Sequence, residues 1–286
     1  IRSRGLYLNE TGDPRFDAMT IEHNAILSAA GNENAVIDAL FSWFAEMRGE
    51  ADELHLSGSL YRLPETALAA HRLICSEIVK PSYSVELGLL TANDGALDPV
   101  LSANARQQLR RAMRHFAAQG PLRFREAATE AEAQSWFTGL KALHCASWER
   151  RGVAHAFRGE IFEKFHRRLI GHRFAEGAIQ LGRARAGKRV IGYLYNFRRD
   201  GHVYAYQSGF ADRDPRERPG VVTHALAIQH AFRSGMRVYD FMAGRNRLKE
   251  SFATRCEPML WQIVQQPKLA FRFEHLVRRL RERIRG

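Results

Sequence analysis

The most regular pattern of apolar and polar positions lies between residues 178 and 210, in AIQLGRARAGKRVIGYLYNFRRDGHVYAYQSGF. Apolar and polar residues alternate there with a period of two, which is typical of β-strands. Two short turn sequences, Ala186-Gly187 and Asp200-Gly201, divide the segment, and Asp-Gly is a strong hairpin signal. The pattern therefore predicts three antiparallel strands joined by tight turns.

Helical spacing is found on both sides of this β-region. Apolar residues recur at intervals of three and four over residues 130–151 and 160–176, and again in VVTHALAIQHAFRSG, which Gly235 ends as a C-terminal cap. The segments RVYDFMAG and PMLWQIVQQ that follow are typical of strands. We therefore expect an α/β arrangement in this half of the chain.

The amino-terminal part also mixes strands and helices. Its strand-like segments are LYL, MTIEHNAIL, ELHLSG, ICSEIVK and YSVEL, and its helix-like segments are NENAVIDALFSWFAEMR and LPETALAAHRL. This order predicts a mixed sheet with helices on its faces. The loop TANDGALDP contains Asn-Asp-Gly and a proline, which is typical of a boundary. One domain is therefore expected over residues 1–98 and a second over residues 99–266.

A basic amphipathic helix is expected over residues 267–286, in PKLAFRFEHLVRRLRERIRG. The apolar residues at helical spacing are Leu269, Phe273, Leu276, Val277, Leu280 and Ile284. The other positions are mostly arginine. Such a helix can lie on an acidic membrane surface, or it can dock on the body of the protein and leave its arginines in solvent.

The charge of the chain gives a hint about its partners. The net charge is +12 and the pI is about 10.1, and SANARQQLRRAMRHFAAQGPLRFR holds several arginines and no acid. A field of this sign attracts phosphates, nucleic acids or anionic lipid. The sequence contains no zinc-finger, RNP or KH motif, so nucleic acid is the less favoured partner.

The cysteines and the hydropathy indicate the cellular compartment in which the protein is expected. Cys75, Cys145 and Cys256 are far apart and lack metal-binding spacing, so neither a disulfide framework nor a metal site is expected. No apolar run approaches the roughly 20 residues that span a bilayer. We therefore expect a cytoplasmic protein, with peripheral association at the inner membrane as the alternative that the basic tail suggests.

Several segments in a fixed order resemble a known family. They are LSANARQQLRRAMR, VIGYLYNF, YAYQSGF, RPGVVTHALAIQHAFRSGMRVYDFMAG and LKESF. This order resembles the acetyltransferase fold of the GNAT superfamily, and more narrowly the CelD/BcsL group, which is related to the FemAB aminoacyl transferases. The resemblance implies an α/β fold of two GNAT-like mixed-sheet units in tandem, followed by the amphipathic tail helix. It also implies acyl transfer from acyl-CoA, or from an acyl carrier protein, to an amine.

The resemblance further implies a donor site where the second unit's central strand leads into a helix. The thioester arm would lie between the strands VYAYQSGF and VYDF, and the pyrophosphate would lie at the helix start, where free N–H groups favour anions. The residues implied are Gly209, Phe210, Arg216, Arg218, Gly220, Val221 and Val222. Only one glycine of the family's phosphate loop is present, so an exposed turn with solvated arginines is the alternative.

Acyl transfer needs a base for the amine and an acid for the departing thiolate. Asp240 lies in an apolar strand, and burial makes a carboxylate a stronger base. Tyr206 is the candidate acid, and His144 is a second candidate base on a helix beside the cleft. The alternatives are an Asp240 paired with Arg245 or Lys249, a Tyr206 that only packs, and a structural His144.

Two groups of residues are candidates for acceptor binding. Arg245, Arg247 and Lys249 follow the end of a strand, where open α/β sheets tend to bind ligands. Glu22 and Asn24 are polar residues in an apolar stretch of the first unit. Solvated cations and ordinary hydrogen bonding inside a sheet are the respective alternatives.

The function predicted from these features is N-acylation of a small-molecule or lipid amine, such as a membrane amino lipid or a sphingoid base, in the manner of a ceramide synthase. A sugar amine or hydroxyl in exopolysaccharide biosynthesis is the nearest alternative acceptor. The remaining candidates are a FemAB-like transferase that uses aminoacyl-tRNA and a binding module without catalysis.

Overall fold

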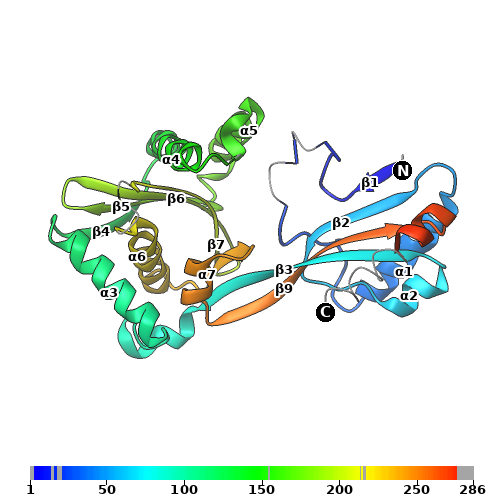
Figure 1. The fold of residues 1–286 in the computed structure, drawn as a ribbon, viewed down its shortest axis with the longest axis horizontal. Helices are drawn as coiled ribbons and strands as arrows, with labels where there is room; N and C mark the ends of the chain where they lie inside the picture. The colour runs from blue at the N-terminus through cyan, green and yellow to red at the C-terminus, as the bar shows by residue number, and fades with distance from the viewer. Residues whose placement is uncertain are drawn as a thin grey trace. The chain divides into compact units, whose positions relative to one another are not determined.

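The computed structural model describes residues 3–13, 16–17, 21–153, 155–212, 214 and 217–275. The chain forms two compact units (Figure 1). Unit 1 comprises residues 1–81 and 257–286, and unit 2 comprises residues 82–256. The domain limits expected from the sequence stay a prediction.

Unit 1 is built on β1 (Gly5–Tyr7), β2 (Glu53–Ser59), the larger part of β9 (Arg255–Gln265) and the first part of β3 (Ile74–Glu86). β1 pairs with β2 in parallel, and β2 pairs with β9 antiparallel. Helices α1 (Glu33–Glu46) and α2 (Glu65–Ala70) supply apolar side chains to its core. In that core Phe41 and Phe44 of α1 are fully buried with Val264 of β9.

Unit 2 follows the helix and strand pattern of the sequence closely. Its elements are η1 (Leu87–Asn93), α3 (Ala103–Ala117), β4 (Leu122–Glu126), α4 (Glu130–Arg150), η2 (Ala156–Arg158), α5 (Glu160–Arg173), β5 (Ile179–Ala186), β6 (Arg189–Arg199), β7 (His202–Phe210), α6 (Pro219–Arg233), β8 (Val238–Ala243) and α7 (Arg247–Phe252). The strand order is β3-β8-β7-β6-β5-β4. All neighbours are antiparallel except β7 and β8, so the predicted mixed sheet is confirmed.

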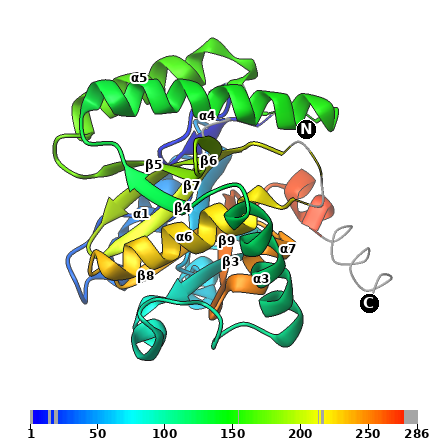
Figure 2. The ribbon, with the colours of Figure 1, turned by 90° about the vertical axis from the view of Figure 1, so that its left-hand side faces the viewer.

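Helices cover both faces of the unit 2 sheet. α4 and α5 lie on one face, and α3 and α6 lie on the other (Figures 1 and 2). On the α6 side the core contains Leu194, Val203 and Ile228, whereas Phe137 of α4 packs edge-on against Tyr195 on the opposite side. Successive residues of β6 thus serve opposite cores, as the period of two requires.

The turn between β6 and β7 is the predicted Asp-Gly hairpin. Asp200 has φ of 47° and Gly201 has φ of 75°, so both central residues are left-handed. That conformation twists the chain in the same sense as the flanking strands, and Asp and Gly adopt it at low cost. The hairpin prediction is confirmed.

The predicted strand MTIEHNAIL is wrong over its described residues. Residues 21–27 form no strand, and His23 has φ of 56°, which breaks the alternation. The segment is held by a close approach to β2, because the Asn24 N–H donates to the Gly58 carbonyl at 2.9 Å. A Cβ at Gly58 would lie 2.2 Å from the Ile21 carbonyl oxygen, so only glycine fits there.

The described start of the tail is helical over residues 269–275, and the rest of the predicted helix, from residue 276, lies outside the described residues. Phe271 is buried, whereas Leu269 and Phe273 are 84% and 69% exposed. Among the residues described, no helix is long and apolar enough to cross a membrane.

Candidate active site

The two parallel strands of unit 2 stay paired for only a short distance. Pairing joins residues 202–204 of β7 to residues 238–240 of β8, although β7 continues to Phe210 and both strands are fully described. Beyond Tyr204, β7 is therefore not paired with β8, and two of its carbonyls have other partners: that of Ser208 accepts from His144, and that of Phe210 accepts from the Asp212 N–H. An extended ligand can pair with an unpaired strand edge as an added strand.

A β-bulge lies at the point where the strands part. Tyr195 of β6 is opposite Gln207 and Asn196 is opposite Ala205, which leaves Tyr206 as an extra residue. A bulge bends its strand and redirects the side chains next to it. The divergence of β7 from β8 thus coincides with a local break in the ladder on its other side.

Two glycines let helices approach the separated end of β7. A Cβ at Gly209 would lie 2.3 Å from the Leu140 carbonyl oxygen of α4, and a Cβ at Gly220 would lie 3.1 Å from the Phe210 ring. Val222, in the first turn of α6, is fully buried. The predicted donor residues Gly209, Phe210, Gly220 and Val222 are therefore brought together around one strand end.

The predicted phosphate loop is only partly described. Arg218 caps α6 in the left-handed conformation, with φ of 54°, and its carbonyl accepts the Val221 N–H at 3.1 Å. Its guanidinium donates to the side chain of Gln108 on α3. Arg216 lies outside the described residues. Arg218 therefore links α6 to α3, and anion binding at the start of α6 stays a prediction.

Asp240 is 7% exposed and holds the turn that ends β8. Its Oδ1 accepts a hydrogen bond from the Met242 N–H at 2.5 Å, and Met242 has φ of 63°, a strained value for a residue with a side chain. Asp240 lies opposite Tyr204 in the ladder. Burial, together with the charge of Asp240, raises the pKa of Tyr204.

The three cations after β8 have separate surroundings. Lys249 Nζ donates to the carbonyls of Ala243 at 2.7 Å and Met242 at 3.2 Å, at the end of the strand. Arg245 is 83% exposed and forms an ion pair with Glu250 at 3.3 Å. Arg247 is exposed at the start of α7. One cation therefore stabilises the strand end, and two face solvent.

Tyr206 contacts a histidine that sequence reasoning missed. The Tyr206 hydroxyl lies 3.1 Å from His166 Nε2, and the Tyr195 hydroxyl lies 3.1 Å from His166 Nδ1. His166 is 2% exposed, and burial lowers its pKa to about 4. A neutral ring donates from one nitrogen and accepts at the other, so both of its nitrogens are satisfied.

His144 lies on the same face of β7 with a different bonding pattern. Its Nδ1 donates to the Ser208 carbonyl at 2.9 Å, which fixes the tautomer with an unprotonated Nε2. That Nε2 is buried and has no hydrogen-bond partner within the described part of the chain. The ring stacks on Trp148, with centroids 5.4 Å apart, and burial lowers the pKa of His144. The unpaired Nε2 can therefore accept a hydrogen bond from another molecule, although the lowered pKa makes this ring a weaker base than an exposed histidine.

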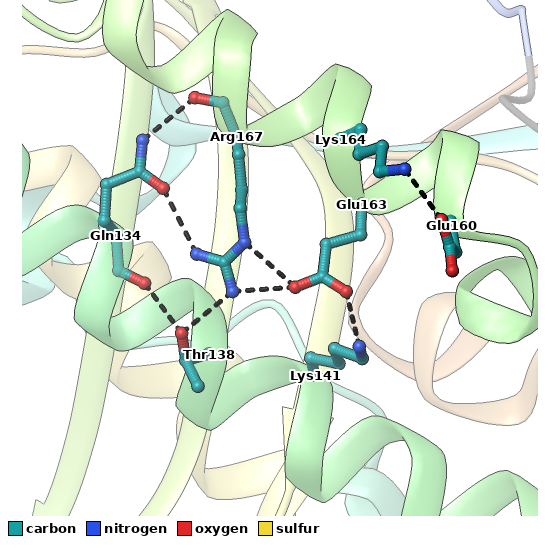
Figure 3. A network of polar contacts seen from close by, with 7 residues as sticks. All are labelled: Gln134, Thr138, Lys141, Glu160, Glu163, Lys164 and Arg167. Carbon is teal, nitrogen blue, oxygen red and sulfur yellow. Dashed lines mark hydrogen bonds and ion pairs between the residues drawn. The ribbon is translucent and has the colours of Figure 1, made fainter.

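Figure 3 shows the polar network that fixes α5 on α4. Glu163 of α5 accepts from Lys141 of α4 and from the Arg167 Nε at 2.9 Å. Arg167 also donates to Thr138 at 3.0 Å, and Gln134 donates to the Arg167 carbonyl at 2.9 Å. Because His166 precedes Arg167, this network sets the position of His166 against β7.

A second missed histidine lies in the α6 core. His224 Nδ1 is 2.9 Å from the Tyr239 hydroxyl, and burial, with a smaller effect of Lys249, lowers the pKa of His224 to about 3. Both missed histidines lie on the buried faces of predicted helices. That helical spacing was the available signal, but the tyrosines that they contact come from other elements, the strands β6, β7 and β8.

The predicted acceptor residues Glu22 and Asn24 lie in unit 1. Asn24 Nδ2 donates to the Leu8 carbonyl at 3.0 Å, and Asn24 Oδ1 accepts from Asn9 at 2.8 Å. Asn24 also lines a cavity of about 230 Å³ with mainly apolar walls. Its amide therefore has partners within its own unit. In the described ranges no three His, Cys, Asp or Glu side chains cluster as metal ligands.

The chain was compared with known proteins. A family profile described as an acetyltransferase (GNAT) domain matches residues 103–250, just over half of the chain. No curated protein sequence matches. The solved structure of FemX is similar in fold, with a TM-score of 0.59, 11% identity, and coverage of 85% of this chain and 79% of FemX.

Two further structures have a similar fold. L-PGS from Bacillus licheniformis has a TM-score of 0.53 at 11% identity, with 88% of this chain and 79% of that chain covered. The C-terminal domain of a putative lysylphosphatidylglycerol synthetase from Agrobacterium fabrum has a TM-score of 0.53 at 11% identity, with coverage of 81% and 73%. At this identity the likeness concerns the fold alone. With its profile match over residues 103–250, the chain belongs to the acetyltransferase (GNAT) domain family and is a GNAT-type N-acyltransferase.

Proposed function

We propose that this enzyme, a member of the CelD/BcsL group, transfers an acyl group from acyl-CoA or an acyl carrier protein to a membrane amino lipid or sphingoid base. The observation that carries the proposal is the separation of β7 from β8 beyond Tyr204. The amide groups of a pantetheine arm can pair with the β7 edge from Ala205 to Phe210. The start of α6, at Gly220 and Val221, would then receive the phosphate.

The proposed chemistry uses groups on both sides of the strand end. His144 Nε2 takes a proton from the acceptor ammonium, and the free amine attacks the thioester carbonyl. Backbone N–H groups of β7 stabilise the oxyanion, the C–S bond breaks, and Tyr206 supplies a proton to the thiolate. The second proton, which the attacking nitrogen loses as the amide forms, returns through solvent to the Tyr206 oxygen and restores its hydroxyl. In this scheme Asp240 keeps the end of β8 turned away from β7.

The lipid acceptor is supported by the first residues of the tail. Lys268 forms an ion pair with the buried Asp52, and the hydrogen bond from Lys268 is the main cause of the lowered pKa of Asp52. Phe271 docks in unit 1, whereas Leu269 and Phe273 point outward beside the exposed Arg272. An outward apolar pair with a cation suits the interface of an anionic bilayer. The name lysylphosphatidylglycerol synthetase, given to one protein of similar fold, also refers to a lipid.

A FemAB-like aminoacyl transferase is the second candidate, because FemX has a similar fold. Its donor would be aminoacyl-tRNA, which the basic surface could attract. The exposed cations Arg245 and Arg247 would then contact phosphates, whereas in the lipid proposal they contact an acidic head group.

Product analysis tests the function directly. The full chain is incubated with palmitoyl-CoA and sphinganine in mixed micelles, and the lipids are analysed by mass spectrometry. An N-acylated base is the expected product, while glucosamine and charged tRNA replace the acceptor and the donor in parallel reactions. Product only with glucosamine would redirect the proposal to sugars, and product only with charged tRNA would redirect it to the FemAB-like reaction.

A glycine substitution tests the donor site. Gly220→Asp adds a carboxylate at the start of α6 against the Phe210 ring, so we expect coenzyme A affinity to fall about 100-fold through repulsion of the phosphates. Gly88→Asp is the matched control, because a Cβ at Gly88 meets nothing within 4 Å. Equal affinities of the two variants in calorimetric titration would remove the phosphate site from α6.

A double substitution tests the membrane contact. Leu269→Glu with Phe273→Glu should reduce sedimentation with phosphatidylglycerol vesicles about tenfold, because two exposed apolar groups are lost and two like charges are added. Leu27→Glu, at a side chain that is 94% exposed, is the control. Unchanged sedimentation of the double variant would exclude these residues from the membrane contact.

A further inference from the structure

Unit 2 contains a groove that the acyl-transfer scheme does not use. It lies between α3, α6 and residues 95–98, and its volume is about 820 Å³. Its apolar lining residues include Leu97, Leu109, Met113, Ala225 and Leu226. Its basic lining residues are Arg106, Arg110 and Arg114 of α3. The groove thus combines an apolar floor with a positive rim.

The rim has spare positive charge. Arg110 and Arg114 are exposed, and the one acid in the lining, Asp98, accepts from Arg110 at 2.6 Å. That pair is 62% and 35% exposed, so water weakens it and a partner's carboxylate can replace it. Arg106 donates to the Leu101 carbonyl at 3.0 Å, and its buried Nε has no hydrogen-bond partner among the described residues.

The spacing of the rim suits an α-helix. Arg106, Arg110 and Arg114 are four residues apart on α3, so successive side chains are separated by about 6 Å along the helix axis. Acids at the same spacing on a partner helix would face them in register. A helix about 10–12 Å wide fills about 500 Å³ per turn, so the groove holds one face of a helix of two to three turns.

Other polyanions fit the groove less well. The lining contains no aromatic side chain on which a nucleic-acid base could stack. A bilayer surface would contact protruding apolar groups, whereas Leu97 and Leu109 are 3% and 4% exposed at the floor. The concave shape with a charged rim favours an acidic amphipathic helix.

The groove adjoins the proposed donor site through one contact. Gln108, which lies between Arg106 and Arg110 on α3, accepts the hydrogen bond from Arg218 at the start of α6. We infer that the groove docks an acidic helix of an acyl carrier protein, so that the carrier's phosphopantetheine enters beside α6. This inference rests on the proposed function and selects the carrier protein as the physiological donor.

Docking is tested with the full chain and an apo acyl carrier protein of fatty-acid synthesis, which has no phosphopantetheine arm. Calorimetric titration should give saturable binding that weakens as salt is raised. Arg110→Glu with Arg114→Glu should weaken this binding about tenfold or more, because two rim charges are reversed. The matched control is Arg48→Glu with Arg199→Glu, which changes the net charge equally at exposed positions outside the groove. The control should bind as the unsubstituted chain does.

A nearly isosteric variant guards against misfolding. Gln107→Glu adds one negative charge at an exposed lining position and should weaken binding about threefold, with an unchanged melting temperature. Absence of carrier binding, or equal weakening in both double variants, overturns the inference. Loss of vesicle or tRNA binding in Arg110→Glu with Arg114→Glu, without carrier binding, would assign the groove to a membrane or to RNA.

The outcomes separate the inference from the proposed function. If palmitoyl-CoA yields an acylated amine and the carrier does not bind, only the docking inference fails. If the carrier binds and neither donor yields an acylated amine, the proposed function fails. Where both hold, the double variant should lose at least about tenfold more kcat/KM with the acylated carrier than with acyl-CoA.

Discussion

Two buried histidines contact β7, His166 at Tyr206 and His144 at Ser208. Their ring nitrogens form different hydrogen bonds. His166 lies between two tyrosine hydroxyls, each 3.1 Å from a ring nitrogen. His144 donates from Nδ1 to the Ser208 carbonyl at 2.9 Å, and its buried Nε2 has no hydrogen-bond partner among the described residues. Burial lowers the pKa of both rings, so both are neutral near neutral pH.

The difference separates a stabilising role from a chemical one. A buried polar atom with a partner contributes to stability, whereas one without a partner costs about 1–3 kcal/mol. That cost is offset when a substrate supplies the missing partner. The unpaired His144 Nε2 is therefore the better candidate for a base, and His166 is better suited to hold Tyr206 in place.

The largest effect is expected for His144→Gln. Glutamine is close to histidine in size, but its amide cannot take up the amine proton, so kcat should fall about 10²–10⁴-fold. The measurement is steady-state acylation with the melting temperature recorded beside it. Loss of stability in proportion to activity would make His144 structural, and activity within a factor of three would assign the base to Asp240 or to water.

The next largest effect is expected for His166→Ala. This change removes both tyrosine contacts and leaves a cavity among Phe137, Phe162 and Tyr206, so the free energy of unfolding should fall by about 3 kcal/mol. Urea unfolding measures the change. In the same titration the free energy of unfolding of His144→Gln should fall by less than about 1 kcal/mol. A larger loss for His144→Gln than for His166→Ala would contradict the comparison of the two histidines.

The pH dependence of stability should be smaller but distinctive. His166 has a folded pKa of about 4, below the unfolded value near 6.5, so the unfolded chain binds more protons between these values. Stability is full above about pH 6.5 and should fall by about 1 kcal/mol per pH unit as the pH drops towards 4. His224, with a pKa of about 3, acts in the same direction.

The variant His166→Phe sharpens this prediction. It removes one titrating ring, so the slope of the free energy of unfolding against pH between about 4 and 6.5 should become shallower by about 1 kcal/mol per pH unit. Chemical denaturation at several pH values provides the slope. An unaltered slope would mean that folding does not change the pKa of His166.

Much of unit 2 could be predicted because its local signals agree with its packing. The alternation over residues 178–210 and the Asp200-Gly201 turn define β5 to β7, and Gly235, with φ of 73°, ends α6 where the pattern does. The segment at residues 21–27 shows the limit. The backbone at Ile21 approaches Gly58 closely, and such a contact leaves no trace in the spacing of apolar residues along the chain.

The sequence was enough to choose candidate residues for the site, but it did not give the contacts that those residues make. His144, Tyr206 and Asp240 were selected, and all three lie on or against β7 and β8. The partner of Asp240 was not foreseen, because the left-handed Met242 that it holds depends on how β8 ends. His166 was missed because Tyr195 and Tyr206, its partners, are 29 and 40 residues away in the chain.

The smallest effect is expected for Arg245→Ala. Unlike the two buried histidines, Arg245 lies in solvent, where a polar group gains or loses little by having a partner. Its side chain is 83% exposed, so water replaces the ion pair with Glu250 and the free energy of unfolding should change by less than about 0.5 kcal/mol. If Arg245 contacts an acidic head group, KM for the acceptor should rise about twofold and the rise should vanish in high salt. Arg237→Ala, whose guanidinium donates to the Asp200 carbonyl at 2.6 Å beside the β6–β7 turn, is the control that should leave KM unaltered. A salt-independent rise in KM for Arg245→Ala would instead indicate that the Arg245 guanidinium becomes buried against the acceptor. Its hydrogen bonds to the acceptor would then determine its contribution to binding, as they do for the buried histidines.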